Sequence, residues 1–219
     1  MTPLPTPGRI IVLNGAPRSG KSSIARVVQA SFDGVWMTLG VDGYMAATPA
    51  ALQPGLGLRP GGERPDLEPL VAVWYAALYG SIAAHSRLGL NVVADVGHHD
   101  AYSRPLGILP DCARRLAGLP VLFVGVRCSI EAIMERRNRG EAGRDGRYAV
   151  GSKGDPVPAP VRAWQEAVHR PGVYDLEVDT SCVSAADCAA VIRAKLAEPL
   201  TSSTAFEWLA AGLPEHFAP

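Results

Sequence analysis

The chain is 219 residues long, 47% of them are hydrophobic, and its 21 Lys and Arg residues balance its 21 Asp and Glu residues. This length fits one domain, and the hydrophobic share is enough for a substantial core. A balanced charge disfavours electrostatic binding to nucleic acid and a charged disordered tail. We expect a single domain over residues 1–219, with its core at 9–197, and no nucleic-acid partner.

Membrane spans and export signals are not predicted. No stretch approaches the roughly 18 consecutive apolar residues of a spanning helix. The N-terminus, MTPLPTPGR, has no apolar run behind a basic start, which disfavours a secretory signal. The cysteines lack metal or redox spacing, so reduced thiols are predicted. We therefore expect a cytoplasmic protein with no membrane partner, and a homo-oligomer is compatible with the sequence.

Five short runs rich in Val, Ile, Leu or Phe alternate with segments of helical periodicity. This pattern is typical of α/β proteins, and near-continuous hydrophobicity fits parallel strands that helices cover on both faces. We expect a mainly parallel sheet whose strands lie at residues 9–14, 35–39, 91–95, 121–126 and 176–179.

Helices are predicted between these strands and at the C-terminal end. A stripe from Trp74 to Ile82 indicates a packed helix face, and Ser129 is a suitable N-cap. The predicted helices span residues 22–31, 67–88, 129–139 and 185–195, with a tail helix at 203–212.

Two segments dense in Gly, Pro and charge break the alternation. They span residues 48–66 and about 136–160. Such composition predicts little contribution to the core, and loops of this length are typically binding segments or lids. We expect 48–66 to contact a substrate and 136–160 to form a lid.

The first predicted strand runs directly into a G-x-x-x-x-G-K-S segment that a helical pattern follows. Glycines there let backbone N–H groups converge on phosphate oxygens, and the helix N-terminus adds partial positive charge. Lys21 is predicted to contact the β- and γ-phosphates, and the Ser22 hydroxyl to bind Mg²⁺. The predicted nucleotide-binding residues of this phosphate-binding loop (P-loop) are Gly15, Ala16, Pro17, Arg18, Ser19, Gly20, Lys21, Ser22 and Ser23.

A different donor is an open alternative for this loop. The run from Ala16 to Gly20 also looks like the loop of sulfotransferases, which bind a phosphosulfate. Those loops usually carry Thr at the position of Lys21. Because Lys21 supplies the charge that γ-phosphoryl transfer uses, ATP is favoured.

Two acids follow predicted strands, at the edge where ligands gather in open α/β sheets. Asp42 is placed to accept the proton of a substrate hydroxyl aligned with the γ-phosphate. A helix cap or turn is the alternative role for Asp42. Asp95 is predicted to hold Mg²⁺ through water or to orient the acceptor, with a buried acid bonded to the P-loop as the alternative.

His98 and His99 come soon after Asp95. Adjacent side chains on an extended segment point opposite ways, and no third His or Cys lies at ligand spacing, which disfavours a metal site. Contact with the substrate is predicted, and an ordinary surface loop is an equal alternative.

Basic residues cluster where the lid is predicted to begin. Arginines on a mobile flap can neutralise charge on transferring phosphate oxygens, so Arg136 is a predicted catalytic and nucleotide-binding residue, followed by Arg139 and Arg144. Interleaved acids leave a solvated surface as the alternative. Asp179 and Thr180 end the fifth strand and are predicted beside the nucleotide, although Asp179 equally fits a turn cap.

Several segments, taken in order, match a known family: Leu13-Asn14-Gly15, Gly20-Lys21-Ser22-Ser23, Gly40-Val41-Asp42, Val93-Ala94-Asp95-Val96, Val124-Gly125-Val126-Arg127-Cys128, Glu135-Arg136 and Tyr174 through Thr180. Through them, the chain from Ile10 to about Lys195 resembles the chloramphenicol phosphotransferase-like family of small P-loop kinases.

The resemblance implies a nucleotide-kinase fold of the P-loop nucleoside triphosphate hydrolase class. The implied sheet has strand order 2-3-1-4-5, helices on both faces and a lid. It also implies ATP-dependent phosphorylation of a hydroxyl group, with Asp42 as general base, Lys21 and Ser22 as phosphate and Mg²⁺ anchors, and Arg136 in the lid or nucleotide site. Residues 48–65 and 97–107 do not match the antibiotic-modifying member, so the acceptor stays open.

We therefore expect a kinase that uses ATP and Mg²⁺ and phosphorylates a small hydroxylated molecule. An ATPase or nucleotide-binding regulator without such an acceptor is the main alternative. A sulfotransferase is the third hypothesis.

Overall fold

The computed structural model describes residues 6–139, 149–198 and 204–212. Its five strands form one sheet in the order β2-β3-β1-β4-β5, and every neighbouring pair is parallel, as predicted. The strands are β1 (Ile10–Asn14), β2 (Trp36–Gly40), β3 (Asn91–Val96), β4 (Val121–Arg127) and β5 (Leu176–Asp179). Each lies within one residue of its predicted bounds.

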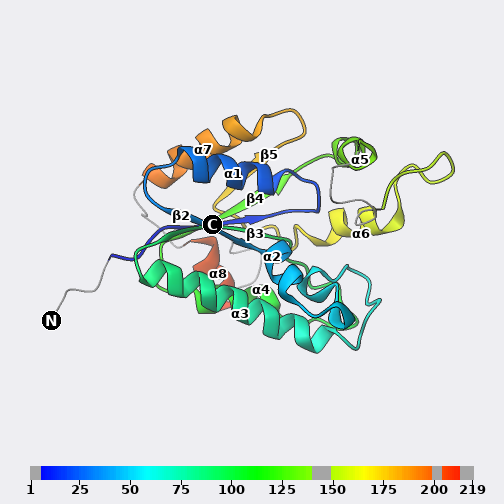
Figure 1. The fold of residues 1–219 in the computed structure, drawn as a ribbon, viewed down its shortest axis with the longest axis horizontal. Coiled ribbons are helices and arrows are strands. Elements are labelled where there is room, and N and C mark those ends of the chain that lie inside the picture. Colours follow the sequence, from blue (N-terminus) through cyan, green and yellow to red (C-terminus); the bar gives the residue numbers. More distant parts are fainter. Residues whose placement is uncertain (1–5, 140–148, 199–203, 213–219) are drawn as a thin grey trace.

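Helices cover both faces of this sheet (Figure 1). On one face lie α1 (Lys21–Ser31) and α7 (Ala185–Ala197), and on the other lie α3 (Glu68–Arg87), α4 (Ile108–Arg115) and α8 (Ala205–Ala211). Alternate residues of β1 serve the two layers, because side chains of a strand point to opposite faces. Ile10 and Val12 pack with α3, whereas Ile11 and Leu13 pack with α1.

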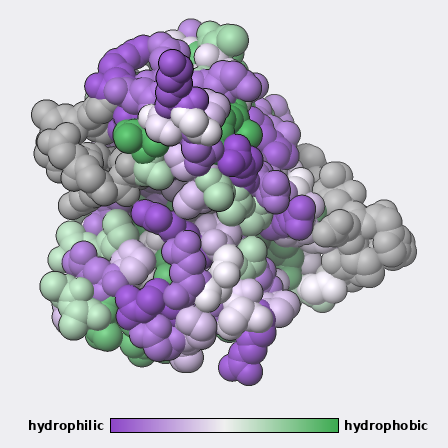
Figure 2. Space-filling view, turned by 90° about the vertical axis from the view of Figure 1, so that its right-hand side faces the viewer, coloured by the Kyte–Doolittle hydropathy of each residue, from purple (hydrophilic) through white to green (hydrophobic). Residues whose placement is uncertain are grey.

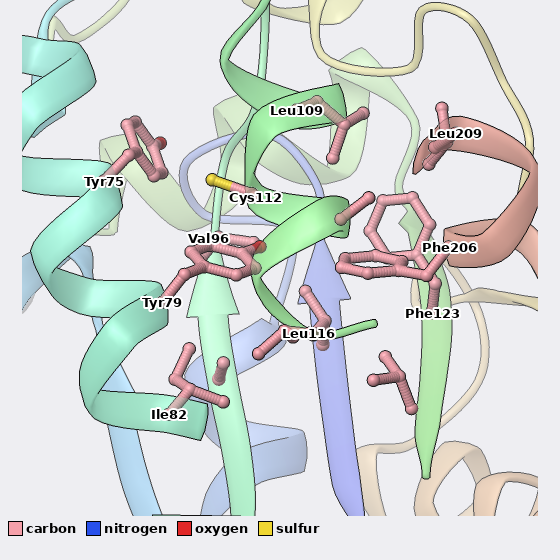
Figure 3. Close-up of a cluster of buried hydrophobic side chains, with 14 of the residues drawn as sticks. Tyr75, Tyr79, Ile82, Val96, Leu109, Cys112, Leu116, Phe123, Phe206 and Leu209 are labelled. Carbon is pink, nitrogen blue, oxygen red and sulfur yellow. The ribbon is translucent and has the colours of Figure 1, made fainter. Parts of the chain in front are cut away.

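The larger core cluster joins α3, α4 and α8 over the sheet (Figure 3). Tyr75 and Tyr79 of α3, Cys112 of α4 and Phe206 of α8 point into it beside Phe123 of β4. The predicted packing face of α3 is confirmed, because Tyr75, Leu78, Tyr79 and Ile82 are buried, while Trp74 is half-buried.

The predicted tail helix forms as α8 and docks on the core. Thr204 and Glu207 form a capping box at its start. The carboxylate of Asp175 then accepts hydrogen bonds from the backbone N–H of Ala205 and of Phe123, both at 2.7 Å. This side chain ties the C-terminal helix to β4.

Three helices were not predicted as such: α2 (Val41–Ala47), α4 and α6 (Ala159–Ala167). Helix α6 has a proline in its first turn, where proline is tolerated because no intrahelical N–H bond is lost. The expected helix after Ser129 is present as α5 (Ile130–Asn138), and the Ser129 hydroxyl accepts from the N–H of Ala132 at 3.2 Å.

The expectation that residues 48–66 add little to the core is wrong. This segment forms two short 3-10 helices, η1 (Ala50–Leu52) and η2 (Gly55–Gly57). Leu56 and Leu58 are each 2% exposed and belong to the core cluster with α3. A Gly- and Pro-rich segment is buried here because α3 provides an apolar surface for it.

All four cysteines are free thiols, as predicted. Among the helices of the described residues, none has both the length and the hydropathy to cross a membrane.

Candidate active site

A cavity of about 1390 Å³ opens at the edge of the sheet where the strands end. Figure 2 shows the molecule from the side that carries α2, α5 and α6 in Figure 1, where hydrophilic residues predominate around hydrophobic patches. We divide the lining into two parts. The P-loop half comprises the P-loop, α1, Arg136, Arg137 and the residues after β5; the α2 half comprises α2, residues 53–59, Tyr75 and Trp164.

The P-loop has the tight geometry that its glycines predict. A Cβ on Gly15 would lie 2.5 Å from the Val126 carbonyl oxygen, so a larger residue cannot fit. Gly20 has φ +95°, a left-handed conformation that glycine adopts without strain, and α1 begins at the next residue. Of the predicted loop residues, Ala16 and Ser19 are buried under the loop, whereas the remaining ones line the cavity.

Lys21 is held over the P-loop. Its ammonium donates to the carbonyl oxygens of Gly15 at 2.9 Å and Ala16 at 3.0 Å, and lies 3.6 Å from a carboxylate oxygen of Asp95. The side chain is only 9% exposed. The charge is therefore fixed where a phosphate cradled by the loop would need it.

Ser22 and Asp95 form a hydroxyl–carboxylate pair beside Lys21. The Ser22 hydroxyl donates to Asp95 at 2.6 Å, and β-sheet register places Asp95 opposite Leu13, next to the P-loop. Mg²⁺ in nucleotide sites is held by one or two such protein oxygens together with phosphates. No cluster of three or more His, Cys, Asp or Glu side chains suited to a metal occurs among the described residues. The Ser22–Asp95 pair is compatible with the predicted Mg²⁺ position, with phosphate oxygens as the further ligands, and Mg²⁺ binding stays a prediction.

Asp42 lies in the first turn of α2 and lines the cavity. The N-cap of this helix is Gly40, so the alternative that Asp42 caps the helix is not supported. An acid in the first turn also interacts favourably with the helix dipole. Asp42 is exposed toward the same cavity as Lys21 and Ser22, although it comes from a different strand end.

Arg136 joins three segments of the site. Its guanidinium donates to the carbonyl oxygens of Arg18 at 3.1 Å and of Thr180 at 2.5 Å. In return, Arg18 donates to the Arg136 carbonyl at 2.6 Å, and the Thr180 hydroxyl donates to the Ser19 carbonyl at 2.6 Å. These bonds hold Arg18 in its left-handed conformation, φ 74°, which is uncommon for a residue with a side chain. Arg136 and Thr180 thus lie beside the P-loop, and their contact with a nucleotide stays a prediction.

Two predicted residues, Asp179 and Arg139, lie away from the main cavity, and a third is not described. The Asp179 carboxylate accepts from the N–H and hydroxyl of Ser181, which lowers its pKa, and it does not line the main cavity. The turn-cap role is therefore favoured for Asp179. Arg139 is exposed and pairs with Glu135 at 2.5 Å, and Arg144 lies outside the described residues. Arg137, which was not predicted, lines the cavity instead and is 6% exposed.

His98 and His99 are buried, at 2% and 5% exposed, so the surface-loop alternative is wrong. His98 Nε2 lies 2.7 Å from the Tyr79 hydroxyl, and burial lowers the pKa of His98 to about 3. His99 Nε2 lies 3.0 Å from the Leu58 carbonyl oxygen, and burial lowers its pKa as well. Neither ring lines the cavity, so their placement favours packing, and contact with an acceptor stays a prediction.

The α2 half has an apolar wall that the sequence did not reveal. Its largest side chains come from α2, η2, α3 and α6, which are far apart in the chain, so no local pattern links them. A single helical stripe could have suggested Tyr75 and Trp164, but not that they meet. The wall consists of Val41, Tyr44, Met45, Leu56, Tyr75 and Trp164, and Arg59 lines the cavity beside it.

A parallel sheet in the order 2-3-1-4-5 with a P-loop at the end of β1 and acids after β2 and β3 defines the class of P-loop kinases. The family model described as chloramphenicol phosphotransferase-like protein matches residues 8–197, and the chain belongs to this family. It is therefore a kinase.

Similar proteins agree with this class. One similar protein comes from Mycobacterium tuberculosis and is found in two strains. Its name describes it as an O-phosphotransferase, an activity assigned by inference. It is 28% identical over 188 residues, 80% of this chain and 76% of that protein.

Solved structures share the fold at low identity. The APS kinase CysC of Mycobacterium tuberculosis, in complex with AMPPNP and APS, has a TM-score of 0.60 at 17% identity, covering 89% of this chain and 100% of that one. A gluconokinase from Sinorhizobium meliloti has a TM-score of 0.55 at 18% identity, covering 88% and 93%.

Proposed function

We propose that this protein transfers the γ-phosphoryl group of ATP to a hydroxyl group of a small molecule, in the presence of Mg²⁺. The observation that carries the proposal is one continuous cavity lined at one side by Lys21 and Ser22 and at the other by Asp42 and an apolar wall. Ligand pockets commonly measure about 300–1,000 Å³, so a cavity of about 1390 Å³ suits two substrates rather than one.

In this reaction the acceptor oxygen forms a bond to the γ-phosphorus, and the bond from that phosphorus to the β–γ bridging oxygen breaks. The products are a phosphate ester and ADP, and the hydroxyl proton passes to the Asp42 carboxylate. Such transfer depends mainly on positioning and charge stabilisation.

Each residue of the P-loop half has a role in this proposal. The backbone of residues 15–23 holds the phosphates, Lys21 neutralises charge on the β- and γ-phosphates, and Arg136 supports the loop and the nucleotide side of the site. Ser22 and Asp95 would hold Mg²⁺, whose charge stabilises the phosphate oxygens when it is bound. Residues 140–148 of the predicted lid lie outside the described residues. On either side of them, Arg136, Arg137, Ala149 and Pro160 line the cavity and would limit access of water.

The apolar wall distinguishes this proposal from an ATPase or regulator without an acceptor. Nucleotide hydrolysis alone does not require apolar and aromatic side chains in the part of the cavity that holds Asp42. An acceptor with an apolar part would need such side chains, because apolar surfaces of a ligand and its pocket are buried together.

The test is mass spectrometry of chloramphenicol and a set of hydroxylated metabolites after incubation with the protein, ATP and Mg²⁺. The Lys21→Ala variant is the control. A compound that gains one phosphoryl group only with the wild-type protein supports the proposal. ATP hydrolysis at the same rate with and without every compound, and no phosphorylated product, would contradict it.

A further inference from the structure

Arg59 is the cation of the α2 half, and no described residue supplies its counter-charge. It follows η2, lines the cavity and is half-buried. Within the parts of the chain that the structure describes, its guanidinium forms no hydrogen bond and no ion pair. Partial burial of a charged group is unfavourable unless a partner compensates it. An unpaired cation at a substrate cavity therefore indicates an anionic ligand group.

A second arginine in the same segment shows the contrast. Arg64 grips Asp66 with two parallel bonds, from Nε at 2.9 Å and Nη2 at 2.8 Å, which is the fork geometry that suits a carboxylate. Arg64 does not line the cavity. Thus Arg64, outside the cavity, is paired with a carboxylate of its own segment, whereas Arg59, which lines the cavity, is available to a ligand.

The backbone on both sides of Arg59 is fixed. Leu58 is buried in the core, and its carbonyl oxygen lies 3.0 Å from His99 Nε2. Pro60 is also buried, and the N–H of Gly61 donates to the Ala101 carbonyl at 2.8 Å. Fixed neighbours limit where the Arg59 side chain can go, and such pre-organisation reduces the entropy lost when a ligand binds.

Arg59 and Asp42 are the charged residues that line the α2 half. They have opposite signs and come from different elements, α2 and the segment after η2. A ligand that places a hydroxyl at Asp42 and an anionic group at Arg59 would share the cavity with the apolar wall. The wall then accommodates an uncharged body.

We propose that the acceptor is a hydroxylated carboxylic acid with an apolar body, and that Arg59 binds its carboxylate. This inference rests on the proposed function. The carboxylate is a recognition group and is not itself phosphorylated, so the transfer step is unchanged. Arg59 thereby selects acids over the corresponding neutral compounds.

The test compares hydroxylated carboxylates with their own primary amides, for example para-(hydroxymethyl)benzoate with its amide, and straight-chain terminal hydroxy acids with theirs. Binding is measured by calorimetry in the presence of Mg²⁺ and a non-hydrolysable ATP analogue, and phosphoryl transfer is measured separately with ATP. The variants are Arg59→Gln, Arg59→Lys and, as matched control from the same segment, Arg64→Gln.

We expect the wild-type protein to prefer acids, and Arg59→Gln to raise the acid Kd and KM by roughly 10- to 100-fold, as for the loss of a charge-assisted bidentate contact. Its kcat, its KM for ATP and its melting temperature should change little, since Arg59 has no partner within the described chain. Arg59→Lys should lie between, and Arg64→Gln should behave as wild type.

Equal binding of acids and amides, no Arg59-dependent binding of any acid, or a raised KM for ATP in Arg59→Gln would overturn the inference. The two proposals separate cleanly in this design. Arg59-dependent acid binding without transfer would support a carboxylate site at Arg59 but contradict the kinase proposal, and with it the identification of the acid as the acceptor. Transfer to amides as fast as to acids does the reverse.

Discussion

At the scale of single residues, the site depends on a few side chains that the sheet brings together from distant positions. Lys21 and Ser22 follow β1, Asp42 follows β2, and Asp95 lies in β3. Parallel strands end at one edge of a sheet, so these residues meet although they are far apart in the sequence. Their separate roles predict separate effects of substitution.

Replacing Asp42 by Asn should remove the proton acceptor while keeping the size and shape of the side chain. Because general-base catalysis contributes roughly 10²- to 10⁴-fold, we expect kcat to fall by that factor while the Kd for ATP stays unchanged. Single-turnover transfer and nucleotide titration measure the two quantities. Turnover near the wild-type rate would assign the base role to Asp95 instead.

His98 should make stability depend on pH. Burial lowers the pKa of His98 to about 3, against about 6.5 in the unfolded chain, and the charge of neighbouring His99 lowers it further. Tyr75 and Tyr79 pack against the His98 ring. Between these values the unfolded state binds the additional proton. The native state therefore loses stability as pH falls from 6.5 toward 3, by up to about 1.4 kcal/mol per pH unit.

The His98→Gln variant removes this titration. Its unfolding free energy, measured by urea denaturation, should fall less steeply than that of the wild type across the same pH interval, even if the variant is less stable at neutral pH. Parallel pH profiles for the two proteins would show that His98 is not buried in its neutral form.

At the scale of elements, helix α8 shows how much of the core depends on the end of the described chain. Phe206 packs edge-to-face on Phe123, with ring centroids 4.8 Å apart, and stacks near Tyr79. Truncating a buried Phe to Ala typically costs about 3–5 kcal/mol, a large part of the roughly 5–15 kcal/mol of a whole domain. We expect a loss of that size for Phe206→Ala in urea denaturation.

Val73→Ala is the matched control for Phe206→Ala. Val73 lies on α3 but is 60% exposed, so its substitution should change stability by less than about 0.5 kcal/mol. A small effect of Phe206→Ala, equal to that of the control, would mean that α8 is not docked on the core in solution.

The contacts among α5, the P-loop and the residues after β5 predict a further effect. Thr180→Val keeps the shape of the side chain but removes the hydroxyl that donates to the Ser19 carbonyl at 2.6 Å. A buried carbonyl left without this partner should lower stability by about 1–3 kcal/mol, and a looser P-loop should weaken ATP binding. Unchanged ATP affinity in this variant would show that the bond serves stability alone.

At the scale of the whole molecule, the sheet was predictable and the acceptor side was not. The strands were found because each is a near-continuous apolar run, and the P-loop because its glycine spacing is local. Helix α4 was missed because it is short and contains Pro110, and Leu56 and Leu58 because their burial depends on α3. The apolar wall combines segments from Val41 to Trp164, and only the tertiary structure brings these together.

Ligand binding should stabilise the fold as a unit, because a ligand that binds only the native state raises its stability by RT ln(1 + [L]/Kd). At a concentration of ATP and Mg²⁺ about 100 times the Kd, the gain is about 2.7 kcal/mol, which thermal denaturation detects as a higher melting temperature. Lys21→Ala should abolish the increase, since Lys21 is the buried cation of the loop. A phosphosulfate donor should produce no increase in the wild type. If the phosphosulfate stabilises the protein and ATP does not, the loop serves sulfotransfer, and the roles assigned to Lys21 and Asp42 both fall with the kinase proposal.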